Sequence, residues 1–287
     1  MNTFAPKRIL CPVDFSDQSA AALRVARVIA HAFGSEVVVL HAQRLEAPVY
    51  FTVAQPQALR TQLRRSARAA QNHTSDLAKR QLPKGVERRV MVVEDDPVTA
   101  ILKVQKEIRA DLIAMGTHGR GGLARVRLGS IAESVLHQAE VPVLTVGPRM
   151  KRTARADAIH QVLCPVDYTP SSQKALEHAA TLTASTGAEL TVAHIDEAPL
   201  DKNAQDSLRE LCDWIPPAVR AHCAVEEVVK QGDAAEQIVA EAEKSHADLL
   251  VLGQQPRNRL GTVLLGSTTE LVIRTAPCPV LSVMGKK

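Results

Sequence analysis

The apolar and polar positions along the first half of this chain follow two patterns. Short apolar runs predict buried strands, and longer stretches with apolar residues three and four positions apart predict helices that cover them. The strands are expected at 8–14, 36–42, 86–93, 111–115 and 141–146, and the helices at 16–33, 57–79, 97–109 and from Ser130 onward. Such alternation predicts an α/β domain, in which right-handed crossovers build a parallel sheet with helices on both faces.

Several helix ends are marked by characteristic residues. Ser16 and Ser130 stand where N-caps are expected, because a serine hydroxyl accepts a hydrogen bond from the first helical turn. Gly34 follows the first helix, where a residue without a Cβ adopts the left-handed conformation that ends many helices. Residues 45–57 contain two prolines and predict a loop.

The second half of the chain repeats the first. The matching segments are 9–14 with 162–167 and 36–41 with 189–194 at a shift of 153, 111–116 with 248–253 at a shift of 137, Gly129-Ser130 with Gly266-Ser267, and 141–146 with 278–283. The change of shift means that the second copy is shorter between its second and fourth strands. We therefore predict two tandem doubly wound domains, 1–148 and 161–287, each with a five-stranded parallel sheet, joined by a linker at 149–160.

Charge is divided unevenly between these two copies. Residues 1–150 carry 21 Lys and Arg against 13 Asp and Glu, whereas 151–287 carry 14 against 18. The positive first half favours an anionic ligand, or attraction between the halves. The aromatic content of 2% disfavours base stacking on nucleic acid, and no apolar run predicts a membrane span or a signal sequence. The five cysteines lack metal-ligand spacing and predict reduced thiols in a cytoplasmic protein.

The predicted helix at 57–79 carries a basic stripe. Arg60, Arg64 and Arg68 recur every four residues and therefore share one face. A stripe of this kind is typical of a solvated helix face, and an acidic partner is the alternative.

A glycine-rich loop joins the fourth strand to the helix that begins near Ser130. Its pattern is Gly116, two residues, Gly119, nine residues and Gly129-Ser130, with Arg120 among its cations. A helix N-terminus offers free backbone N–H groups to an anion, and glycine lets the backbone approach that anion closely. The loop therefore indicates phosphate binding, with an ordinary surface loop as the alternative.

Polar residues at strand ends lie toward the same crevice if the first and fourth strands are neighbours. Asp14 is a candidate to accept hydrogen bonds from a ribose, a base or metal-bound water, and capping the next helix is its alternative role. His118, inside the glycine loop, is a candidate phosphate contact. His41 and its repeat His194 fit structural roles at strand ends better.

The segment CPVDFS at 11–16, the strand end His41-Ala42 and the glycine loop together resemble the universal stress protein family, in its ATP-binding branch, over nearly the whole chain. The resemblance implies Rossmann-like domains of the adenine nucleotide alpha hydrolase type that bind ATP, with or without Mg²⁺. It implies that adenosine lies beside Pro12, Val13 and Asp14, with Ala42 behind the adenine. The residues that it implies for ribose and phosphates are Met115, Gly116, Gly119, Gly129, Ser130 and Ile131.

The second copy departs from this pattern. Asp167, Gly253, Gly266 and Ser267 remain at matching positions, but Pro256 stands where the second glycine belongs. Proline fixes φ and lacks a backbone N–H, so we expect weaker nucleotide binding in the second copy.

The sequence thus predicts a nucleotide-binding module for stress response or regulation. A slow ATP-hydrolysing enzyme is one alternative, although no carboxylate pair, nucleophile–base set or metal cluster stands out near the loop. An interaction protein without a functional nucleotide is another.

Each half ends in an apolar strand that would leave an exposed sheet edge. We expect the two halves to pair internally through these fifth strands, about a pseudo-twofold axis. The sequence leaves open whether whole chains form homo-oligomers.

Overall fold

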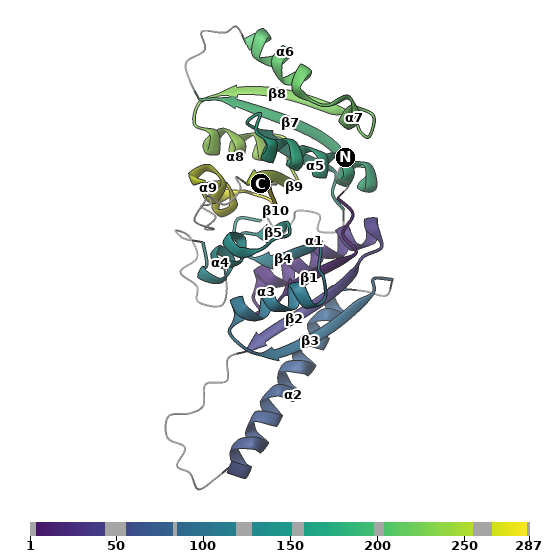
Figure 1. The fold of residues 1–287 in the computed structure, drawn as a ribbon, viewed down its shortest axis with the longest axis vertical. Coiled ribbons are helices and arrows are strands. Elements are labelled where there is room, and N and C mark those ends of the chain that lie inside the picture. Colours follow the sequence, from purple (N-terminus) through teal and green to yellow (C-terminus); the bar gives the residue numbers. More distant parts are fainter. Residues whose placement is uncertain are drawn as a thin grey trace.

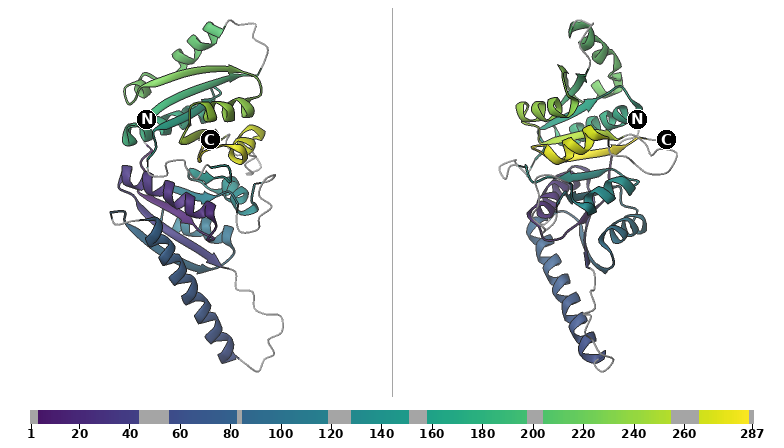
Figure 2. Two further views of the ribbon diagram at one scale, coloured as in Figure 1. Left: turned by 180° about the vertical axis from the view of Figure 1, so that it is seen from behind. Right: turned by 90° about the vertical axis from the view of Figure 1, so that its left-hand side faces the viewer.

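The computed structural model describes residues 4–43, 56–82, 85–118, 128–150, 158–197, 204–254 and 266–285, with the backbone alone at 56–63 and 204. These residues form one ten-stranded sheet with helices on both of its faces (Figures 1 and 2). The strand order is β3-β2-β1-β4-β5-β10-β9-β6-β7-β8, so each half of the chain builds one half of the sheet.

Strands and helices alternate in the first half, as the hydrophobic pattern predicts. They are β1 (Arg8–Pro12), α1 (Asp17–Phe33), β2 (Glu36–Gln43), α2 (Pro56–Gln81), β3 (Arg88–Glu94), α3 (Pro97–Glu107), β4 (Leu112–Gly116), α4 (Ser130–Gln138) and β5 (Val143–Val146). Neighbouring strands within this half pair in parallel. The first and fourth strands are indeed neighbours, and the strand order reverses between them.

The second half repeats this arrangement. Its elements are β6 (Gln161–Val166), α5 (Pro170–Thr186), β7 (Glu189–Asp196), α6 (Ala204–Trp214), α7 (Pro217–Arg220), β8 (Val225–Gln231), α8 (Ala234–Lys244), β9 (Leu249–Gln254), α9 (Ser267–Thr275) and β10 (Val280–Met284). The short helices α6 and α7 stand between β7 and β8, where the first half has α2 between β2 and β3. This is where the second copy is shorter in sequence.

Most predicted helix ends agree with the structure. The Ser16 hydroxyl accepts a hydrogen bond from Ser19 N at 3.2 Å, and Gly34 ends α1 at φ 67°. Thr169 and Gly187 repeat these two roles around α5. The predicted N-cap at Ser130 is wrong: Gly129 is the N-cap of α4, and Ser130 is its first helical residue.

The physical reason is a backbone contact. Gly129 N donates to Thr117 O at 3.0 Å, which holds Gly129 in an extended conformation, so the helix starts one residue later than predicted. Three strands are also shorter than predicted, since β1 ends at Pro12, β3 starts at Arg88, and β5 starts at Val143, directly after Pro142. Proline has no N–H to give to a strand ladder.

The two halves meet where β5 pairs with β10. This pairing is antiparallel, with Leu144 opposite Leu281 and Thr145 opposite Val280. The Thr145 hydroxyl also donates to Val280 O at 3.3 Å. Because the other pairings within each half are parallel, this antiparallel seam relates the halves by an approximate twofold axis.

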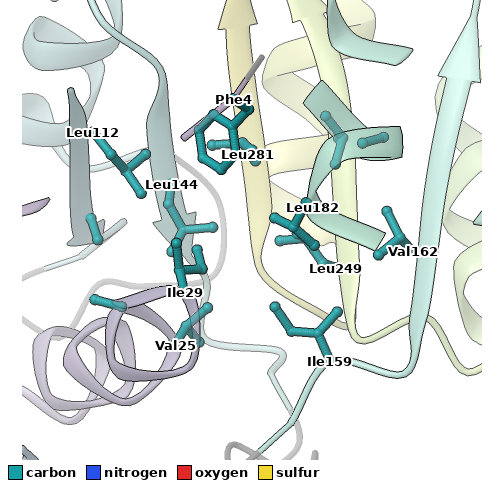
Figure 3. Packing of buried hydrophobic residues seen from close by; sticks show 14 of the residues in the cluster. Phe4, Val25, Ile29, Leu112, Leu144, Ile159, Val162, Leu182, Leu249 and Leu281 are labelled. Carbon is teal, nitrogen blue, oxygen red and sulfur yellow. The ribbon is translucent and has the colours of Figure 1, made fainter. Parts of the chain in front are cut away.

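One hydrophobic core runs across this seam. Figure 3 shows Leu144 from the first half near Leu281 and Leu182 from the second, with Phe4 beside them. Leu144, Leu281 and Leu182 are completely buried, and Phe4 is nearly so. Burial of this apolar surface favours a joined sheet over two separate ones.

Helix α2 is long, at 26 residues, and Figures 1 and 2 show it projecting beyond the sheet. Among its described side chains, 64–81, the buried ones are Thr74, Leu77 and Ala78, toward its C-terminal end. Within the described part of the chain, no helix combines the length and the apolar character that crossing a bilayer requires.

Candidate functional site

A cleft of about 300 Å³ opens in the first half at the carboxyl ends of β1 and β4. We call it the first cleft. Its lining contains ten of the residues that the sequence indicated, namely Pro12, Val13, Asp14, Ala42, Met115, Gly116, His118, Gly129, Ser130 and Ile131. The structure thus brings together segments that are more than a hundred residues apart in sequence. Two further candidates, Gly119 and Arg120, lie outside the described residues.

Six further residues line the first cleft and were not predicted: Ser19, Leu40, Pro97, Ile101, Thr117 and Ala132. Leu40 could have been found, because it is two positions before Ala42 and therefore on the same face of β2. Pro97 and Ile101 share one face of α3, but their place at the cleft follows only once α3 is known to cover this face of the sheet.

Asp14 shapes the turn between β1 and α1. Its Oδ1 accepts hydrogen bonds from Ser16 N at 3.1 Å and from Ser16 Oγ at 2.6 Å. Between these residues Phe15 has φ 65°, a conformation that non-glycine residues adopt rarely. Both hydrogen bonds end on one carboxylate oxygen, so the turn role and a ligand role are compatible.

His41 acts as a structural residue at the end of β2. Its Nδ1 lies 2.8 Å from Val13 O, and since a carbonyl only accepts, this nitrogen donates. The imidazole also packs against the ring of Phe15 at 4.5 Å between centroids, and Phe15 stacks on His73 at 4.3 Å. These contacts fix the carboxyl end of β1 against β2, which supports the structural role predicted for His41.

Two glycines of the first cleft allow close backbone packing. A Cβ on Gly116 would lie 2.7 Å from Gln18 Cβ and 3.0 Å from Ser19 N. A Cβ on Gly129 would lie 2.6 Å from Thr117 O. Glycine is therefore required for α1 to cover the end of β4 and for the start of α4 to rest on the backbone of Thr117.

The start of α4 presents hydrogen-bond donors to the first cleft. The first backbone N–H groups of a helix have no acceptor within the helix, and Ser130, Ile131 and Ala132 of this first turn line the cleft. His118 lies two residues after the end of β4 and close to Gly129, with Nδ1 2.8 Å from Thr117 Oγ1. The positive end of the α4 dipole favours an anion at this place.

A second cleft of about 510 Å³ occupies the corresponding place in the second half. Asp167, Gly253 and Gly266 line it, as predicted, whereas Ser267 does not and the neighbouring Thr268 and Thr269 do. The turn between β6 and α5 has the same hydrogen bonds as the turn between β1 and α1. Asp167 Oδ1 accepts from Thr169 N at 3.2 Å and from Thr169 Oγ1 at 2.5 Å. Pro256 lies outside the described residues.

The second cleft differs from the first at the start of its last helix. Among the described residues, its chain neighbours aside, no atom lies within 4 Å of the place where a Cβ on Gly266 would be. Gly129, in contrast, is pressed against the backbone of Thr117. The helix start that closes on β4 in the first half therefore stands away from β9 in the second.

The second cleft is also more acidic. The carboxylates of Asp167, Asp196 and Glu197 line it, whereas Asp14 is the acidic residue in the described lining of the first cleft. His194 repeats the structural contact of His41, with Nδ1 2.9 Å from Val166 O, and its Nε2 lies 3.2 Å from Asp196 Oδ1. Burial, with smaller effects of Glu210 and Asp196, raises the pKa of Tyr168 to about 12.

Three of the cysteines are buried, and their thiols are unreactive. Burial raises the pKa of the Cys11, Cys164 and Cys278 thiols far above its ordinary value. A thiol in this state is a poor nucleophile and a poor metal ligand. Among the described residues, no group of three or more His, Cys, Asp or Glu side chains is arranged to hold a metal ion.

Comparison with known proteins gives the same family for both halves of the chain. The universal stress protein family matches residues 6–147 and 158–283. A universal stress protein of Mycolicibacterium smegmatis is 30% identical over 189 residues, which cover 61% of this chain and 62% of that relative, less than two thirds of its length.

A solved structure shows the same fold over the whole chain. The crystal structure of a universal stress protein from Archaeoglobus fulgidus is similar over 99% of this chain and 100% of the other, with a TM-score of 0.77 and 24% identity, and so has the same fold. Another solved universal stress protein, in complex with cAMP, covers 45% of this chain with a TM-score of 0.36 and 27% identity. The two family matches together span most of the sequence, which confirms the resemblance seen in its motifs. This chain belongs to the universal stress protein family and contains two tandem copies of its domain.

Proposed function

We infer that the first half of this chain binds an adenine nucleotide, ATP, in the first cleft, and that the protein acts as a regulatory or stress-response module. The observation that carries this proposal is the arrangement of the first cleft: an apolar slot at one end and the start of α4, with its unpaired N–H groups, at the other. A nucleotide has the same division between an apolar base and anionic phosphates.

The apolar end of the first cleft suits a flat base. Leu40, Ala42, Ile101 and Met115 contribute apolar side chains from β2, α3 and β4. Most small-molecule sites combine such an apolar lining with a few polar groups that fix orientation. Asp14 is positioned to be one of these groups, because its carboxylate accepts hydrogen bonds and ribose hydroxyls donate them.

The other end of the first cleft suits phosphates. Ser130, Ile131 and Ala132 supply the free N–H groups of the α4 N-terminus, and His118 lies beside them, with its Cα 3.5 Å from the Cβ position of Gly129. Anions bind at helix N-termini because the N–H groups and the helix dipole act together. A Mg²⁺ ion with ATP would rely on phosphate oxygens and on Asp14, which is consistent with the few protein ligands that this ion usually takes.

We expect titration of the full chain with ATP to show one tight site. The second cleft has an open helix start at Gly266, three carboxylates and Pro256 in its loop, so its affinity should be lower by about tenfold or more, equivalent to about 1.4 kcal/mol. Isothermal titration calorimetry of the full chain measures this directly. Two equivalent sites per chain would contradict the proposed difference between the halves.

A slow ATP-hydrolysing enzyme is the second candidate, since Asp14 could contribute to a metal site. Phosphoryl transfer needs a positioned water and neutralised charge on the leaving group, and in the described lining of the first cleft Asp14 is the one carboxylate for such a role. We expect turnover below about one per second, under the ordinary enzyme range. A faster rate that is lost in Asp14→Ala, measured by phosphate release, would contradict a purely regulatory role.

An interaction protein without a functional nucleotide remains the third candidate. Denaturing the protein as purified and separating the released small molecules on a column tests it. ATP or another adenine nucleotide in about equal amount to the protein supports the proposal. No bound nucleotide, together with no heat on titration with ATP, would leave the interaction role.

A further inference from the structure

Helix α2 has one anchored end and one exposed end. Its buried residues, Thr74, Leu77 and Ala78, pack on the body of the first half near β3. Toward the N-terminus, no side chain from Arg64 to Asn72 is buried. Figures 1 and 2 show from three directions that this part of α2 extends away from the sheet. We call the helical segment 56–73 the arm.

The arm is strongly basic. Over its whole length α2 contains six Arg and Lys residues and one Asp. Arg64 and Arg68 lie four positions apart, one turn beyond Arg60, and Arg65 stands beside them. Within the described part of the chain, none of Arg64, Arg65 and Arg68 forms an ion pair.

An exposed helix of this composition is marginal by itself. Most helical stability in proteins comes from packing of one face, and among the described side chains of the arm, 64–73, none is buried. Like charges four positions apart destabilise a helix further. An acidic surface against the arginines would remove this repulsion and supply the missing contact.

Such a surface lies at the opposite end of the molecule. Helix α6 presents the exposed carboxylates of Asp206, Glu210 and Asp213 against one cation, Arg209. Leu208, in the same helix, is 39% exposed. Among the described residues, two large apolar side chains are exposed to this extent. The other is Ile131, which lines the first cleft. α6 thus offers an exposed apolar side chain among acidic ones.

The arm cannot reach α6 of its own chain. α2 lies next to β3 and α6 next to β8, and these two strands are the opposite edges of the ten-stranded sheet. Figure 1 shows the arm at the bottom and α6 at the top. A contact between them therefore joins two molecules.

We propose that the basic arm of α2 docks on the acidic α6 surface of a second copy of this chain. Two copies that lie antiparallel make this contact twice, which gives a closed twofold dimer, the commonest symmetry of protein oligomers. The charge difference between the halves, basic in residues 1–150 and acidic in 151–287, favours this orientation and opposes pairing of like ends.

Sedimentation velocity of the full chain at low and high salt tests the proposal. We expect mass above the 31.0 kDa of one chain at low ionic strength, and dissociation as the Debye length falls from about 30 Å at 0.01 M to about 3 Å at 1 M salt. The double variant Arg64→Glu and Arg68→Glu should weaken association at least about tenfold, because two attractive contacts become repulsive. Circular dichroism verifies that the variants are folded.

A charge exchange identifies the partner surface. Asp206→Arg with Glu210→Arg should weaken association as the arm variant does, and an equimolar mixture of the two variants should associate again. The matched control for the arm variant is Lys103→Glu with Lys106→Glu on the exposed surface of α3. Like the arm variant, it replaces two positive charges by two negative ones, and it should leave association unchanged.

Three results would overturn the proposal. One is a chain that stays monomeric at low salt. Another is association that the arm variant does not weaken, or that the α3 control weakens equally. The third is a monomer that binds duplex DNA or anionic vesicles through Arg64 and Arg68, which would assign the arm to a different kind of partner.

Discussion

We expect Gly129→Val to weaken ATP binding to the full chain by about a hundredfold. The new Cβ would lie 2.6 Å from Thr117 O. This is a backbone atom held in place by the strand end, so the start of α4 must move. Movement there misplaces the N–H groups of Ser130 and Ile131. Two lost hydrogen bonds to a charged group, at about 1.5 kcal/mol each, amount to about a hundredfold in affinity.

The second half provides the matched control for this experiment. Gly266 precedes α9 as Gly129 precedes α4, but no atom of another described part of the chain lies within 4 Å of its Cβ position. Gly266→Val should therefore leave both ATP affinity and stability almost unchanged. Calorimetric titration measures both variants. Equal loss in the two variants would point to a general effect of the substitution, and no loss in either would remove α4 from the nucleotide site.

The second large effect concerns stability. Leu144→Ala should lower the free energy of unfolding by about 2–5 kcal/mol, as is usual for truncating a buried leucine. Leu144 is completely buried in β5 and lies opposite Leu281 of β10. Because the core is continuous across this seam, the loss should be felt by both halves of the chain.

Trp214 makes this coupling measurable, since it is the one tryptophan of the chain and lies in the second half. Urea unfolding followed by Trp214 fluorescence should shift together with unfolding followed by circular dichroism. Lys103→Ala, at an exposed position on α3, should shift neither by more than about 0.5 kcal/mol. If Leu144→Ala produces an early transition that leaves Trp214 fluorescence unmoved, the halves unfold independently.

Local pattern predicted most of the fold because the relevant forces are local. Ser16 and Gly34 mark the ends of α1 by their own hydrogen bonding and backbone freedom, and the structure confirms both. Ser130 did not cap α4, because the backbone of Gly129 is held by Thr117, a residue that the sequence does not show to be adjacent. A cap decided by a contact between distant segments is beyond what a local pattern can predict.

The first cleft shows the same division. Asp14, Ala42 and Gly116 stand at strand ends, and parallel strands direct their carboxyl ends to one edge, so their convergence could be predicted. Pro97 and Ile101 could not, because a helix that follows a strand can cover either face of the sheet. Their role depends on the side of the sheet on which α3 packs.

The amino-acid pattern was enough to predict two copies of one α/β domain, the segments that form the strands, and ten of the residues that line the first cleft. Periodicity, caps and repeats carry that information because each depends on neighbours in the chain. The pattern could not show that Gly129 is pressed against Thr117 while no described segment contacts the Cβ position of Gly266, because both glycines precede a serine and a helix; the folded structure settles this. It also decided that the C-terminal end of α2 is anchored while its basic arm projects. These properties depend on which distant segments fill the surrounding space, and that is fixed by packing.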